Sequence, residues 1–159
     1  LSKAYGFAGW RIGYMVVPEH LFLPIQKVQD TILICPPLIG QAAAVGALEA
    51  GSGYCARFKR NMEDVRSLVL NELDQIRNVC TIPPSRGAFY FLLQLDTSLD
   101  SMDLVSRLIK DYGVAAIPGT TFGIEQGCFL RVSYGALERE TVAQGTGRLV
   151  RGIRDILCR

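Results

Sequence analysis

The second half of the sequence predicts a small α+β unit, and three observations support this fold class. The segment from Gly87 to Leu95 is almost continuously apolar, which indicates a strand that must be covered on both faces. A long helix with apolar residues spaced by three or four precedes it, from about Tyr54 to Arg77. After the strand, short strands and helices alternate up to the end of the chain, as in a sheet backed by helices.

The first half of the chain is predicted to contain a loop, a strand and two helices. Three glycines among the first thirteen residues indicate a tight loop that leads into a strand from Trp10 to Val17. The apolar spacing from Glu19 to about Thr31 predicts a helix, which we expect to be regular only from Pro24 onward. The small residues from Ile39 to about Gly51 predict a second helix.

The second half carries clear signals for where its elements begin and end. Asp100 or Ser101 is expected to cap a helix that continues to Tyr112, and Gly113 is expected to end it. The further elements that we expect are strands over Val114–Ile117 and Phe129–Tyr134 and a closing helix over Glu138–Leu157.

The composition excludes several classes of function. The 159 residues have a net charge of +2, and acidic and basic residues are mixed along the whole chain. No basic patch for nucleic acid or for a membrane surface is therefore indicated. No apolar run reaches the roughly 18 residues that a membrane span requires. We expect neither nucleic-acid nor membrane partners.

The cysteines and the single histidine argue against a metal site. The five cysteines lie far apart without a CxxC pair, and His20 is the only histidine in the chain. Zinc sites need such residues at short spacing, so we expect no metal. We expect the thiols to be reduced, as in a cytoplasmic protein. The cysteines are Cys35, Cys55, Cys80, Cys128 and Cys158.

The first thirteen residues contain the pattern that is most informative about function. Lys3 follows the small residue Ser2, precedes Arg11 by eight positions, and is accompanied by glycines at regular places. This segment resembles the cofactor-attachment segment of class I and II aminotransferases, which depend on pyridoxal 5'-phosphate. The resemblance implies that Lys3 is the catalytic residue that holds the cofactor covalently, and that Arg11 and Ser2 also bind the cofactor.

The residue types suit this chemistry. A primary amine is needed to form a Schiff base with the cofactor aldehyde, and Lys3 supplies one. The guanidinium of Arg11 can form two parallel hydrogen bonds with the phosphate and keeps its charge at any working pH. A lysine and an arginine at this spacing can also be two solvated surface charges. The match over the whole segment favours the cofactor site.

A second block lies in the predicted small unit. The segments Val114–Gly123 and Cys128–Tyr134 resemble the part of the same family that lies near the substrate. There, the resemblance implies that Arg131 binds the α-carboxylate of the substrate, because a guanidinium matches a flat carboxylate in two hydrogen bonds. An arginine in an apolar strand is costly to desolvate without a partner, so an internal glutamate partner is the alternative.

The resemblance covers essentially the whole chain and implies a fold type I enzyme. It implies that residues 1–60 are the C-terminal part of the large cofactor-binding α/β domain and the start of the interdomain helix, and that residues 61–159 are the small α+β domain. It also implies transamination between an amino acid and a 2-oxo acid, and a homodimer. The segment Val28–Cys35 is faintly similar to enzymes that act on aromatic amino acids or methionine.

We also expect the chain to lack part of the site. It begins Leu1-Ser2-Lys3 without an initiator methionine, and chemistry so close to a frayed end is unusual. The family's aspartate at the pyridine nitrogen would lie upstream of Lys3, and no acid of this chain is assigned that role. The isolated chain is therefore expected to be inactive.

Two other functions are compatible with the same residues. A β-lyase or a synthase of the same fold would not need a 2-oxo acid acceptor, so product analysis with and without one separates it from a transaminase. A transcription regulator could carry an aminotransferase-like sensor domain, in which Lys3 binds the cofactor without turnover. A basic helix-turn-helix upstream would favour that function.

Overall fold

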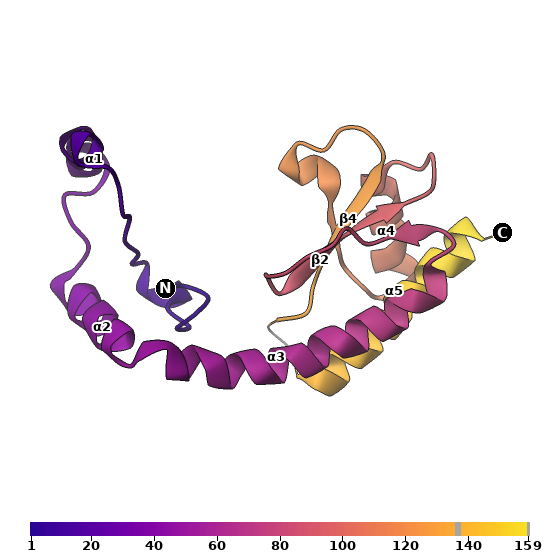
Figure 1. Cartoon of the computed structure of the whole chain (residues 1–159). Coiled ribbons are helices and arrows are strands. Elements are labelled where there is room, and N and C mark those ends of the chain that lie inside the picture. The colour runs from indigo at the N-terminus through magenta and orange to yellow at the C-terminus, as the bar shows by residue number, and fades with distance from the viewer. Residues whose placement is uncertain (136–137, 159) are drawn as a thin grey trace. The chain divides into compact units, whose positions relative to one another are not determined.

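The computed structural model describes residues 1–135 and 138–158, which form two compact units (Figure 1). The first unit consists of residues 1–59 and the second of residues 60–159. Helix α3, Gly51–Leu73, contains residues of both. Each unit is described by itself below.

The first unit is mainly helical. A short 3₁₀ helix, η1 (Ala8–Trp10), is followed by α1 (Glu19–Ile32), α2 (Leu38–Glu49) and the start of α3. The two helices predicted here are confirmed. Helix α1 nevertheless begins at Glu19 and contains Pro24, so the expectation of a later start was wrong. Pro24 is the sixth residue of α1, where its missing N–H removes one hydrogen bond without ending the helix.

The strand predicted over Trp10–Val17 is wrong. Residues 12–18 have neither helical nor strand structure, although their composition favours a strand. A strand exists only when its backbone N–H and C=O groups pair with a neighbour. The described residues of the first unit contain no strand that could provide this pairing. The composition of residues 12–17 therefore shows that the segment is apolar, but it does not show whether a neighbouring strand is present to pair with it.

The second unit is a four-stranded antiparallel sheet with helices. Its strands lie in the order β1-β2-β4-β3, so the last two in the sequence exchange places in the sheet. The remaining helical elements are α4, α5 and two short 3₁₀ helices, η2 and η3. The bounds are η2 Asp74–Ile76, β1 Cys80–Thr81, β2 Tyr90–Leu95, α4 Ser101–Tyr112, β3 Ile117–Pro118, η3 Gly119–Phe122, β4 Cys128–Ser133 and α5 Arg139–Leu157.

The elements predicted in this unit are confirmed in type, with differences at their ends. Asp100 caps α4 by accepting hydrogen bonds from the backbone N–H groups of Met102 and Asp103, and Gly113 ends it in the left-handed conformation. Strand β3 is shorter than predicted, because only Ile117 and Pro118 pair with β4.

One face of the sheet forms the core with the helices. Alternate residues of β2 and β4 are buried together with apolar residues of α3, α4 and α5. The opposite face carries Tyr90 and Gln94 of β2, which are exposed. The prediction that the Gly87–Leu95 strand is covered on both faces was therefore wrong for the described residues of this unit. The reason is that Tyr90 and Gln94 provide polar atoms for solvent on that face.

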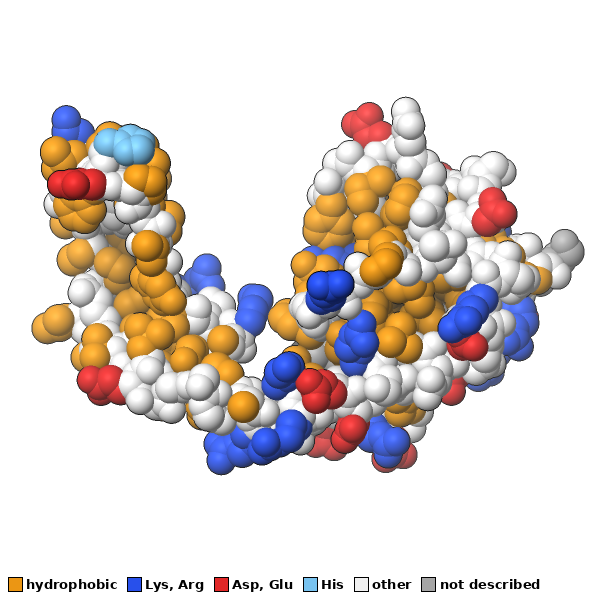
Figure 2. All heavy atoms as spheres, viewed as in Figure 1, with side chains coloured by type: hydrophobic (Ala, Val, Ile, Leu, Met, Phe, Trp, Pro, Cys, Tyr) orange, Lys and Arg blue, Asp and Glu red, His pale blue; other side chains and the backbone are white. Residues whose placement is uncertain are grey.

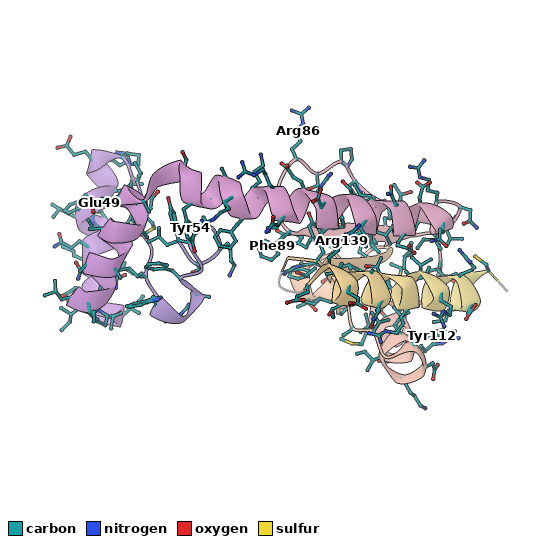
Figure 3. The ribbon with its side chains drawn as sticks, turned by 90° about the horizontal axis from the view of Figure 1, so that it is seen from below. Glu49, Tyr54, Arg86, Phe89, Tyr112 and Arg139 are labelled. Atoms are coloured by element: carbon teal, nitrogen blue, oxygen red, sulfur yellow. The ribbon has the colours of Figure 1, made fainter. Side chains whose placement is uncertain are left out.

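The helices pack closely over the core. Figure 3 shows α5 lying alongside the C-terminal part of α3, and Arg154 of α5 donates a hydrogen bond to Gln75 Oε1 at 3.2 Å. Helix α4 approaches α5 at Gly152, where a Cβ atom would lie 2.6 Å from Leu108 Cδ2. None of the helices in the described ranges has both the length and the apolar character that crossing a membrane requires.

Candidate functional site

Lys3 lies in a tight turn at the start of the first unit. The backbone N–H of Tyr5 donates to the carbonyl oxygen of Leu1 at 3.0 Å, which closes the turn around Ser2 and Lys3. Gly6 follows with φ of +69°, a conformation that favours glycine. The side chain of Lys3 is exposed and Ser2 is half-buried. The amine is thus presented at the surface of the loop, and the described residues of the first unit do not enclose it.

Arg11 ends η1 in an unusual backbone conformation. Its φ of 51° and ψ of 41° lie in the left-handed region, which non-glycine residues rarely adopt. Its Nη1 atom donates to the carbonyl oxygen of Ala8 at 3.0 Å. The other guanidinium N–H groups donate no hydrogen bond to any described residue. Backbone strain of this kind is characteristic of functional sites, and the free N–H groups remain available to an anion.

Contacts that the sequence did not reveal fix this loop within the first unit. Cys55 Sγ lies 3.4 Å from the carbonyl oxygen of Ala4, and the rings of Tyr5 and Tyr54 stack with centroids 5.8 Å apart. Partial burial and the neighbouring Cys55 raise the pKa of Tyr5. Ile12 is buried and lies against Gly40 of α2. These contacts join residues far apart in the sequence, so only the aromatic character of residues 5 and 54 could have indicated them.

The second unit holds Arg131 near the middle of its sheet. Arg131 lies on β4 opposite Leu92 of β2 and Ile117 of β3. Residues that are opposite each other in an antiparallel pair share a face, so Arg131 projects from the face that carries Tyr90. The Cζ atom of Arg131 lies 4.4 Å from the ring centroid of Tyr90 and 5.3 Å from that of Phe122.

Arg131 has no polar partner among the described residues. Its Nε atom is buried and forms no hydrogen bond, and no carboxylate of the described chain pairs with the side chain. The internal glutamate that the sequence left open as an alternative is therefore not found in the part of the chain that the structure describes. An unpaired guanidinium of this kind is a candidate binding group for an anion.

The structure thus brings Lys3, Ser2 and Arg11 into one loop, and places Arg131 in the other unit. No cluster of three or more histidine, cysteine, aspartate or glutamate side chains that could hold a metal ion occurs among the described residues. The donors present are an exposed amine and two guanidinium groups with unused N–H groups. The donors of the first unit fit an aldehyde and a phosphate, and the guanidinium of the second unit fits a carboxylate.

Comparison with known proteins identifies the family. Residues 1–149 match the family of class I and II aminotransferases. The chain belongs to this family. An aromatic aminotransferase from Arabidopsis thaliana is 34% identical over 98% of the chain and 40% of its own length. A valine–pyruvate aminotransferase from Mycobacterium tuberculosis is 36% identical over 84% of the chain and 35% of its own length. The chain therefore spans about 40% of the length of the curated aminotransferases that it matches.

Solved structures agree with this assignment. The crystal structure of an aminotransferase from Mycobacterium tuberculosis matches 97% of this chain with a TM-score of 0.84 and 29% identity, and this covers 40% of that chain. The predicted fold type I architecture is confirmed for this portion of the aminotransferase fold. The turn at Lys3, the left-handed Arg11 and the unpaired Arg131 are features of this chain itself.

Proposed function

We propose that the chain is part of a pyridoxal-phosphate-dependent aminotransferase that moves an amino group between an amino acid and a 2-oxo acid. Residues 1–60 belong to the large cofactor-binding domain and the start of the interdomain helix, and residues 61–159 form the small domain. The observation that carries the proposal is the loop of the first unit. It presents the exposed amine of Lys3 and the unused donors of Arg11 within eight residues of each other.

The cofactor fits the donors of this loop. Pyridoxal phosphate, when bound, supplies an aldehyde for covalent attachment and a ring that withdraws electrons from the reacting carbon. Lys3 would hold the aldehyde end through Nζ. Arg11 would bind the phosphate through the N–H groups that do not bond to Ala8, and Ser2, next to Lys3 in the sequence, would also bind the cofactor. Nζ of Lys3 would also accept the proton of the substrate α-carbon.

Arg131 provides the group that orients the substrate. Its guanidinium is charged and has no polar partner among the described residues, so a substrate carboxylate satisfies donors that otherwise remain unpaired. Two hydrogen bonds to a flat carboxylate fix both the position and the rotation of the substrate. An amino acid and its 2-oxo acid share this carboxylate, so the same arginine serves both halves of the transfer.

We also propose a cytoplasmic homodimer. A cytoplasmic location is supported by the cysteines: all five are free, and Cys80 and Cys128 lie buried without a disulfide partner. In support of association, α1 and α2 expose many large apolar side chains, and Figure 2 displays hydrophobic side chains gathered in this unit. Examples are Phe22, Leu23, Ile32, Leu38 and Ile39.

Borohydride trapping tests the cofactor site. The chain is mixed with pyridoxal phosphate at near-equal concentration, reduced, digested and analysed by mass spectrometry. We expect the label mainly on Lys3, because Arg11 holds the phosphate beside it, and much less on Lys27, Lys59 or Lys110. Arg11→Gln is expected to lower labelling of Lys3 several-fold, whereas the matched surface variant Lys27→Arg leaves it unchanged. Equal labelling of all four lysines would contradict the proposed site.

Product analysis tests the reaction. In a polypeptide as long as the relatives, consumption of an amino acid is expected to require a 2-oxo acid acceptor, which separates a transaminase from a lyase. The isolated chain is expected to show no turnover, because the described residues of the first unit leave Lys3 exposed. Turnover by residues 1–159 alone would contradict this expectation.

A further inference from the structure

Two aromatic side chains lie against the guanidinium of Arg131. Tyr90 comes from β2, where it pairs with Ser133 and is therefore the diagonal neighbour of Arg131 on the same face. Phe122 comes from η3, which follows β3 directly. The two rings have centroids 4.4 Å and 5.3 Å from Arg131 Cζ. Both distances are within the range of a cation–π interaction.

The backbone around Phe122 keeps its ring at this place. Gly119 begins η3 and is buried against β4, where a Cβ atom would lie only 2.6 Å from Phe129 Cβ. Gly123 ends η3 in the left-handed conformation, with φ of +78°. The backbone N–H groups of Gly123 and Ile124 close the turn by donating to Thr120 and Gly119. A side chain at position 119 would therefore push η3, and with it Phe122, away from Arg131.

The two rings restrict the guanidinium without satisfying its N–H groups. A cation–π interaction stabilises the charge, but the aromatic faces leave the N–H donors of Arg131 without a hydrogen-bond acceptor. The buried Nε of Arg131 is unpaired among the described residues. The side chain is thus held in place while its hydrogen-bonding capacity is kept for a ligand. Because the side chain of Arg131 is already ordered before a ligand arrives, binding does not have to include the entropy cost of ordering it.

We propose that Tyr90 and Phe122 are positioning residues, which fix the guanidinium of Arg131 so that it binds a carboxylate without losing further side-chain freedom. This rests on the proposed function, in which Arg131 is the carboxylate-binding group. Neither aromatic residue needs to contact the substrate for this role. Both are partly exposed, at 38% for Tyr90 and 47% for Phe122, so they can be replaced without disturbing the buried core.

The side-chain NMR signal of Arg131 tests the positioning. In the 159-residue chain, Hε of Arg131 is expected to be shifted upfield by the two rings, and its absence in Arg131→Gln assigns the signal. Tyr90→Leu and Phe122→Leu are each expected to move it toward the position of a free arginine. Tyr90→Phe and Phe122→Tyr keep a ring and are expected to keep the shift. An unchanged signal in both leucine variants would overturn the proposal.

Titration with pyruvate, a small 2-oxo acid, tests the consequence. The Arg131 signal is expected to move on titration, and each leucine variant should bind roughly two- to fivefold more weakly, because binding must then order a side chain that the rings no longer hold. The ring-keeping variants retain wild-type affinity. Leucine variants with wild-type affinity would overturn the positioning role and leave the proposed function intact. No response of the Arg131 signal to pyruvate would instead contradict the carboxylate-binding role itself. The upfield shift of Arg131 Hε would still show whether the two rings position the guanidinium.

Discussion

At the scale of the residue, Arg11 in the first unit and Arg131 in the second keep donors unused for different reasons. Arg11 satisfies one N–H group on the carbonyl oxygen of Ala8 and is held by a strained backbone. Arg131 has no hydrogen bond to a described residue and is held by aromatic rings. Arginine suits both places because its charge persists at any working pH and its planar fork fits phosphate as well as carboxylate. Lysine at either position would supply a charge without this geometry.

Cys80 is the residue whose ionisation the fold opposes most clearly. It is 6% exposed, and burial raises the pKa of its thiol from 9.0 to about 11. Below pH 9 the thiol is neutral in both the folded and the unfolded chain and does not affect stability. Between pH 9 and 11 it ionises only in the unfolded chain, so the folded state loses stability as the pH rises. We expect a loss of about 2–3 kcal/mol at pH 11 from this residue.

Urea unfolding at several pH values measures this loss. The free energy of unfolding is expected to fall more steeply above pH 9 in the wild-type chain than in Cys80→Val, which has no thiol at this site. Cys35→Val is the matched control, because Cys35 is exposed, and it should retain the wild-type slope. Identical pH dependence of the unfolding free energy in wild type and Cys80→Val would show that burial does not oppose ionisation of this thiol.

At the scale of the element, the sequence predicts what is encoded locally. Both ends of α4 could be predicted, because Asp100 and Gly113 act on the few residues beside them. The strand over Trp10–Val17 was wrongly predicted, because strand formation depends on a partner elsewhere in space that the sequence pattern does not show. Lys3 and Arg11 could be proposed as cofactor-binding residues from the sequence because they lie in one short motif. The neighbours of Arg131 could not, because Tyr90 and Phe122 reach it only through the sheet register and the turn at η3.

Two glycines of α5 are expected to respond to alanine with opposite signs. Gly152 faces α4, and an added Cβ atom would lie 2.6 Å from Leu108 Cδ2 and 3.0 Å from the Tyr112 ring. Gly152→Ala is therefore expected to destabilise the chain by about 1–3 kcal/mol through overpacking. Gly147 has no neighbour within 4 Å of its Cβ position, so Gly147→Ala is expected to stabilise by up to about 1 kcal/mol through helix propensity.

Thermal unfolding of the two alanine variants measures the difference. Both variants replace glycine with alanine in the same helix, so the contribution of helix propensity is common to both. The difference in their stability therefore reports the packing around each residue. A Gly152→Ala variant at least as stable as Gly147→Ala would contradict the close approach of α4 and α5. It would also weaken the account of the core, which depends on this contact.

At the scale of the whole molecule, the two units differ in how much they bury. The apolar cluster of the core is formed by residues of the second unit alone, from Val69 to Ile153. In the described residues of the first unit, only Ile12, Gly40 and Ala44 are buried. Because helices shorter than about 12–15 residues are marginal in water without tertiary packing, α1 and α2 have little to stabilise them within their own unit.

Hydrogen exchange is therefore expected to separate the two units. Amides of β2, β4, α4 and α5 should exchange only through unfolding of the second unit, whereas those of α1 and α2 should exchange roughly a hundredfold faster or more through local opening. The experiment is run at low and high chain concentration, because a homodimer formed through the exposed apolar side chains of α1 and α2 would slow their exchange as concentration rises. Protection of α1 and α2 equal to that of the second unit at every concentration would contradict this account. The small buried core of the first unit would then be sufficient to stabilise its helices.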